Sequence, residues 1–205
     1  MMWIDITHTL SEEIAPWPGD TPFALRYFST KDENGSANIA EISGSNHIGT
    51  HMDAARHVAN DGWTMEQVDI QRLIGDATIL TFTETTTITR DDLKQCSIEG
   101  TIVLIKTRDV SDPTVFPTSI TVLTTDAIDY LAELGVHVLG VDVPSVDVLD
   151  SETLDNHHRL VQHHMYHIEN LCLDEVSTGH YHFIGMPLKI KGADAAYLRA
   201  VVAKK

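Results

Sequence analysis

The segment from position 47 to position 57 reads His-Ile-Gly-Thr-His-Met-Asp-Ala-Ala-Arg-His, with three histidines and one aspartate within eleven residues. If the backbone is extended from 37 to 53, side chains alternate between two faces, and positions 47, 49, 51 and 53 share one face. Two imidazoles and a carboxylate would then project together, with Gly49 leaving open space among them. Such ligands suit zinc or manganese. The local pattern therefore predicts a metal site, and the alternative is a coincidental polar cluster.

This segment supplies too few ligands for a closed two-metal site, so others must come from elsewhere in the chain. Seven of the 12 histidines lie between His157 and His182. Glu169 stands in an apolar, strand-like run, where a buried carboxylate needs a partner. The pattern alone leaves three questions open: whether Glu169 faces solvent, whether these histidines form a solvated helix face, and which of His157 and His158 binds metal.

Composition excludes several classes of protein. The chain has 205 residues without a repeat or linker, so we expect one domain over residues 1–205. The formal net charge is −16 and no basic cluster is present, which argues against nucleic-acid binding. No apolar run is long enough for a membrane span. The N-terminus has no secretory pattern, which predicts a cytoplasmic protein.

Runs of β-branched or alternating apolar residues predict several short strands. These are residues 2–9, 23–28, 37–43, 77–82, 101–107, 136–141, 166–171 and 181–188. Helices are expected at 89–95 with Thr89 as cap, at 124–134 before Gly135, and at 151–162. The excess of strands with scattered helices predicts a mixed α/β fold.

The motif His47-x-Gly49-Thr50-His51-x-Asp53-x-x-x-His57 resembles the signature of the cyclase-like metal-dependent hydrolases. Further blocks resemble that family in the same order along nearly the whole chain, at residues 3–6, 17–23, 140–147, 157–171, 186–188 and 192–194. The loop at 17–23, Trp-Pro-Gly-Asp-Thr-Pro-Phe, is typical of its formamidase branch. The resemblance implies a cyclase-like (swivelling β/β/α-type) fold with mixed β-sheets and flanking helices, usually as a homodimer.

The resemblance also implies a metal centre, commonly of two zinc ions, with manganese or another divalent metal as alternatives. The implied ligands are His47, His51, Asp53, His157 and Glu169, and the implied acid/base is His57. His157 is preferred because the family's ligand histidine stands twelve residues before the glutamate. The other histidines, His167 among them, are expected to be surface or packing residues.

The implied reaction is hydrolysis of the small-molecule amide N-formyl-L-kynurenine to L-kynurenine and formate, in tryptophan degradation. A metal-bound hydroxide would attack the formyl carbon, and His57 would carry the proton to the aniline nitrogen. Trp17 is the candidate for stacking on the aromatic ring of the substrate, with a hydrophobic plug as its alternative role. Asp142 and Asp147 are expected mainly as turn residues, or in support of the site.

Some positions depart from the family pattern. Where the family usually has Asp-Ala-Pro and an apolar residue, this chain has Asp53-Ala54-Ala55-Arg56, and Val58 and the tail at 194–199 also differ. These changes leave the identity of the substrate undecided. One alternative is a related amidohydrolase for another amide or a cyclic amide of the isatin type. The other is a metal-binding protein without turnover. Arg56 is expected either to meet a substrate carboxylate or to be solvated.

Overall fold

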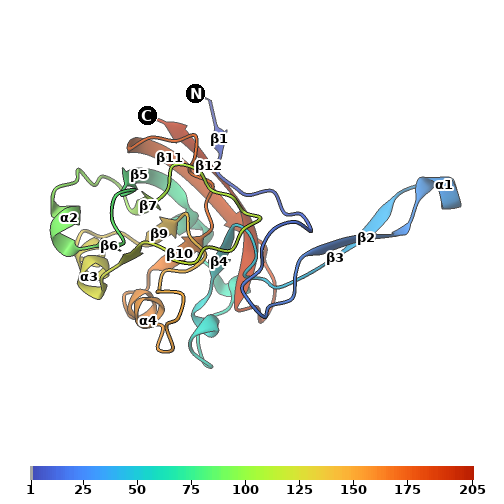
Figure 1. The fold of residues 1–205 in the computed structure, drawn as a ribbon, viewed down its shortest axis with the longest axis horizontal. Helices are drawn as coiled ribbons and strands as arrows, with labels where there is room; N and C mark the ends of the chain where they lie inside the picture. The colour runs from blue at the N-terminus through green and yellow to red at the C-terminus, as the bar shows by residue number, and fades with distance from the viewer. Residues whose placement is uncertain (1) are drawn as a thin grey trace.

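The computed structural model describes residues 2–205, and its centre is one mixed sheet of eight strands that closes on itself (Figure 1). The strands are β1 (Ile4–Asp5), β4 (His51–Asp53), β5 (Ile74–Thr81), β7 (Ile102–Lys106), β9 (Val138–Val141), β10 (Tyr166–Glu169), β11 (Gly179–Pro187) and β12 (Ala195–Lys204). Their order is β1-β12-β11-β5-β7-β9-β10-β4, and β4 also pairs with β12. That second pairing closes a barrel-like ring, with β1 attached outside it. The run from β5 to β10 is parallel, and the other pairs are antiparallel.

Three helices flank one side of the ring (Figure 1). They are α2 (Arg90–Lys94), α3 (Thr125–Glu133) and α4 (Asp155–Gln162). A short parallel pair is formed by β6 (Thr87–Ile88), which precedes α2, and β8 (Val122–Leu123), which precedes α3. Thr89 caps α2, because its hydroxyl oxygen accepts a hydrogen bond from the Asp92 amide. None of the helices between residues 2 and 205 has the length and apolar character to span a bilayer.

The core has two main layers, one inside the ring and one beneath the helices. Along β7, Ile102 and Leu104 belong to the inner cluster, and Val103 and Ile105 belong to the cluster under the helices. All four side chains are fully buried. A strand that is covered on both faces reads as a continuous apolar run rather than an alternating one, which explains this sequence.

A two-stranded hairpin projects away from the ring (Figure 1). It consists of β2 (Ala24–Ser29) and β3 (Ile39–Ser43), with the short helix α1 (Lys31–Asn34) at its tip. Every residue of β3 is exposed, and so are the four central residues of β2. The hairpin therefore stands largely outside the core.

Most predicted elements are present, but several differ from the prediction. The first strand is confined to β1, and α4 begins at Asp155 rather than at 151. The longest strand, β12, was not predicted. The extended backbone expected from 37 to 53 is wrong for 44–50, which form turns and bends. Gly49 has a φ of 65° there, a conformation that favours glycine, and a Cβ would have to displace a methyl of Leu10 that lies 2.6 Å away.

Candidate metal centre

Two cross-strand pairs on β4 and β10 form the base of the centre. The register places His51 opposite Glu169 and Asp53 opposite His167. The residue between them on β4, Met52, belongs to the core inside the ring. Because side chains alternate along a strand, the four polar side chains point to the other face. They are 0–3% exposed, so two carboxylates and two imidazoles share one buried patch.

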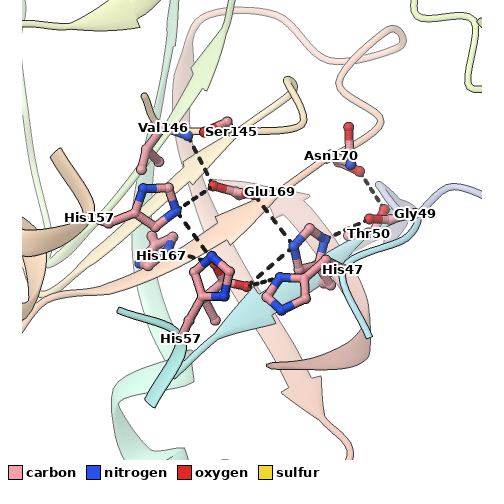
Figure 2. A network of polar contacts seen from close by, with 12 residues as sticks. His47, Gly49, Thr50, His57, Ser145, Val146, His157, His167, Glu169 and Asn170 are labelled. Carbon is pink, nitrogen blue, oxygen red and sulfur yellow. Dashed lines mark hydrogen bonds and ion pairs between the residues drawn. The ribbon is translucent and has the colours of Figure 1, made fainter. Parts of the chain in front are cut away.

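Three more histidines reach this patch from the surrounding segments (Figure 2). His47 comes from the turn before β4, and its Nδ1 lies 3.0 Å from Asp53 Oδ1. His57 ends the 3₁₀ turn η1 (Ala55–His57) after β4, with Nε2 4.0 Å from Asp53 Oδ2. His157 comes from α4, and its Nε2 lies 3.6 Å from Asp53 Oδ2 and 3.5 Å from Glu169 Oε1. The structure thus brings together all six residues that were predicted as ligands or acid/base.

Each buried carboxylate faces histidines on both sides. Asp53 Oδ1 faces His47 and, at 3.3 Å, His51 Nε2, while Oδ2 faces His157. Glu169 Oε2 lies 3.4 Å from His51 Nε2, and Oε1 lies on the side of His157. Oε1 also accepts a hydrogen bond from the Val146 amide (Figure 2). Both oxygens of each buried carboxylate therefore lie beside imidazole nitrogens.

The donor set fits divalent cations. In the described part of the chain, three buried side-chain polar atoms have no hydrogen-bond partner, and two of them are His51 Nε2 and Asp53 Oδ1. Leaving such atoms unpaired costs about 1–3 kcal/mol each, which a bound cation would remove. Donor atoms within 4.8 Å of one another form two groups, which share Asp53. The groups are Asp53, His157, His167 and Glu169, and His47, Asp53 and His57.

The pKa shifts of the cluster show that its two buried carboxylates favour positive charge on the groups beside them. Burial opposes the charged form of His157, but hydrogen bonds with Asp147 and Asp53 raise its pKa to about 12. Burial also opposes a charge on His51, but the two carboxylates raise its pKa to about 10. Burial and the neighbouring Asp53 oppose ionisation of Glu169, yet the histidines lower its pKa to about 2. Metal ions would supply the same positive charge and leave the imidazoles neutral.

His57 differs from the other histidines of the cluster. Burial lowers the pKa of His57, and the carboxylate of Asp53 compensates only in part. Its side chain is 29% exposed, against 1% for His51. The ring centroid lies 4.3 Å from that of His47 and 5.5 Å from that of His157. His57 is therefore a neutral imidazole at the open side of the cluster, with a ring nitrogen that can accept a proton.

Backbone and carboxylate partners orient the histidines beneath the cluster. His157 Nδ1 lies 2.6 Å from Asp147 Oδ2, and the same carboxylate accepts the amide hydrogens of Asn156 and His157 in the first turn of α4. His51 Nδ1 donates to the Gly49 carbonyl oxygen at 2.9 Å. Such partners fix the tautomer that leaves Nε2 free for a metal. Of the two roles considered for Asp147, support of the site fits this geometry.

Two members of the cluster were missed in the sequence. His167 Nε2 lies 3.2 Å from Asp53 Oδ2, and the residue is 3% exposed. Its position two residues before Glu169 on a strand was the available signal, because i and i+2 share a face. Asp194, just before β12, lies 3.0 Å from His47 Nε2 and 3.9 Å from His57 Nδ1. Asp194 lies in the block at 192–194 that resembles the family, but the sequence assigned it no role, because only the fold brings it to His47.

A cavity of about 500 Å³ opens above the cluster. Trp17, Ser145 and Leu154 line it together with most of the cluster. Trp17 packs edge to face on Phe116, with ring centroids 5.1 Å apart, so the indole forms a wall of the cavity. The volume suits a small aromatic molecule. Arg56 is exposed and lies outside this lining.

Known proteins share both the sequence and the fold. The Cyclase family model, described as "Putative cyclase", matches residues 4–148. A kynurenine formamidase of Bacillus cytotoxicus is 40% identical over 201 residues, covering 98% of this chain and 96% of the relative. A solved structure described as a potential metal-dependent hydrolase with cyclase activity superposes with a TM-score of 0.84 at 26% identity, covering 98% and 96% of the two chains. Isatin hydrolase A of Labrenzia aggregata shares the fold, with a TM-score of 0.82 at 22% identity over 98% and 93%.

Proposed function

The chain belongs to the cyclase family, and from this premise we propose that it is a metal-dependent amide hydrolase that converts N-formyl-L-kynurenine to L-kynurenine and formate. One observation carries the proposal. A buried cluster of histidines and two carboxylates forms the floor of an open cavity, in a chain 40% identical to a kynurenine formamidase over nearly its full length. The reaction belongs to tryptophan degradation. A cytoplasmic location stays a prediction from the sequence.

The metal would be held by His47, His51, Asp53, His157 and Glu169. We infer two zinc ions for this set, with manganese or another divalent ion as alternatives, because both carboxylates face histidines on two sides. When bound, such ions lower the pKa of a coordinated water from 15.7 to about 7 and polarise a carbonyl oxygen. The buried carboxylates then serve as ligands and counter-charges.

His57 performs the proton transfers. Its imidazole is neutral and lines the cavity beside Asp53, so it can accept the proton of the attacking water. The water oxygen bonds to the formyl carbon, the C–N bond breaks, and His57 donates the proton to the departing aniline nitrogen. Trp17 offers its indole face as the wall against which the substrate ring packs. A purely structural metal site would not need a histidine in the place of His57.

Substrate choice is tested by offering two amides to the same metal-loaded protein. We expect kynurenine release from N-formyl-L-kynurenine, and much slower opening of isatin, whose hydrolases share only the fold with this chain. The control variant is His57→Ala, which should bind metal and lose turnover. Faster hydrolysis of isatin than of the formamide would assign the chain to the cyclic amides. Metal binding without turnover of either amide would contradict an enzymatic role.

A homodimer is proposed as the assembled form, supported by the projecting hairpin. On β2 and β3, Leu25 pairs with Ile42 and Tyr27 pairs with Ala40, all on one face. Leu25, Tyr27 and Ile42 are 43%, 59% and 62% exposed. A lone two-stranded hairpin is marginally stable in water, so an apolar face of this kind is expected to be covered, here by a second copy of the chain.

The dimer is tested by light scattering after gel filtration. Wild-type protein should have the mass of two chains at micromolar concentration, and a double change of Leu25→Ser and Ile42→Ser should shift it to one. Leu134→Ser, an equally exposed residue after α3, is the matched control and should leave the mass unchanged. A wild-type monomer would contradict the proposal.

A further inference from the structure

A second, narrow cavity adjoins the cavity above the metal centre. The two share Trp17, His47 and Pro144 in their walls. The narrow cavity has a volume of about 30 Å³, against about 500 Å³ for the larger one. A single water needs about 10–15 Å³ on this scale. The narrow cavity therefore admits a group of the size of a carboxylate and excludes an aromatic ring.

Arg108 lines this narrow cavity with part of its guanidinium unpaired. One nitrogen, Nη2, donates to the main-chain oxygen of Asp142. Nε is the third of the buried polar atoms without a hydrogen-bond partner in the described chain, beside the two at the metal centre. Between residues 2 and 205, no carboxylate oxygen lies within 4.0 Å of the Arg108 guanidinium. Among residues 2–205, Arg108 is therefore a half-buried cation with one unpaired donor and no carboxylate partner.

The neighbouring carboxylates form no ion pair with the Arg108 guanidinium, although its positive charge counteracts the burial that raises the pKa of Asp142. The carboxylates of Asp112, Asp142 and Asp174 each accept hydrogen bonds from main-chain amides and from hydroxyl groups. Burial lowers the pKa of His8, and Arg108 lowers it further against the effect of Asp174. His8 is therefore neutral near pH 7. Arg108 is the permanent cation of the narrow cavity, and an anion entering there would find a charge to pair with.

We propose that Arg108 binds the α-carboxylate of the substrate, an inference that rests on the proposed formamidase function. When the formamide group of the substrate lies over the metal centre, the aromatic ring of the substrate lies beside Trp17, which lines both cavities. The amino-acid chain on the adjacent ring carbon then extends into the narrow cavity. A guanidinium pairs with a carboxylate through two parallel hydrogen bonds, which adds direction as well as charge. Arg108 thus selects formamides that carry an amino-acid carboxylate.

The test compares two substrates that differ in this carboxylate. N-formyl-L-kynurenine and 2′-formamidoacetophenone share the ring, the ketone and the formamide, and only the first has an amino-acid end. We expect Arg108→Gln to lower kcat/KM for N-formyl-L-kynurenine by about 10- to 100-fold, mainly through KM, because a charged hydrogen-bonded pair is lost. The same change should leave kcat/KM for the acetophenone nearly constant. Arg108→Lys keeps the charge but lacks the planar guanidinium. Its kcat/KM for N-formyl-L-kynurenine should lie between those of the wild-type protein and Arg108→Gln.

Arg72→Gln is the matched control, because Arg72 also donates to main-chain carbonyl oxygens, those of His137 and His164, but lies outside both cavities. It should leave the ratio of the two kcat/KM values unchanged. An equal loss on both substrates in Arg108→Gln would overturn the proposal, since it would indicate a structural role. Wild-type protein that hydrolyses the two formamides equally well would overturn it too, while leaving the formamidase function intact.

A measurement on unaltered protein covers the case in which the variants fail to fold. L-kynurenine should inhibit hydrolysis of 2′-formamidoacetophenone at least tenfold more tightly than 2′-aminoacetophenone does, because only kynurenine carries the carboxylate. Equal inhibition by the two amines would overturn the role of Arg108. If the metal-loaded protein hydrolyses neither formamide, the proposed function itself fails, and this carboxylate site fails with it.

Discussion

Replacing Asp147 by asparagine should weaken metal binding without removing any ligand. The Asp147 carboxylate lies 2.6 Å from His157 Nδ1 and also accepts two amide hydrogens at the start of α4. Asparagine keeps the size but loses the charge, and a charge-assisted hydrogen bond of this kind is worth about 1.5–3 kcal/mol. Loss of such an orienting partner typically weakens metal affinity by about 10- to 100-fold, or about 1.4–2.8 kcal/mol. We therefore expect Asp147→Asn to lower zinc affinity by this factor.

The affinity is measured by competition with a fluorescent zinc chelator, so the result does not depend on turnover. Asp142→Asn is the matched control, because Asp142 is equally buried on the same turn but binds Thr107 and no histidine. This control should lower the free energy of unfolding and leave zinc affinity unchanged. Wild-type affinity in Asp147→Asn, or an equal loss in both variants, would refute the reasoning that Asp147 acts through His157.

Three further expectations follow from the cluster. His57→Ala should lower kcat by about 10²- to 10⁴-fold while zinc content, measured by elemental analysis, stays at the wild-type level; loss of zinc would make His57 a ligand instead. His167→Ala should weaken zinc binding because Asp53 loses its contact at 3.2 Å, and His167→Gln, which restores a donor, should recover part of it; unchanged affinity in both would leave His167 a packing residue. Chelation should lower the melting temperature by about 5–10 °C, because zinc at a hundred times its Kd stabilises by about 2.7 kcal/mol. In calorimetry, chelation should lower the melting temperature of Glu169→Gln by less than that of the wild-type protein. An equal decrease in both would place the stabilising metal elsewhere.

The predicted parts of the fold are those with strong local patterns. The apolar run of β7 and the helices α2 and α3 appear where they were expected. β12 was not predicted because four of its ten residues are alanine, which has a low strand propensity. These alanines are buried because β12 lies between neighbouring strands of the ring, a pairing that no local pattern reveals.

The candidate site was predicted better than the backbone that carries it. His51 and Asp53 do share one face of a strand, but His47 reaches them from a turn in which Gly49 adopts a positive φ. The residues that surround the cluster were harder to find. Asp194 and Arg108 join the cluster or its cavities only through the closure of the ring and the folding of long loops, so the sequence did not reveal the role of either residue.

The central claim is that the buried cluster holds the metal on which formamide hydrolysis depends. The most direct test strips the protein of metal, adds zinc in steps, and measures bound zinc and kynurenine release on the same samples. We predict no turnover without metal, and a rate that rises with bound zinc until the cluster is filled. Full turnover by the metal-free protein, or a filled cluster that releases no kynurenine, would contradict the account.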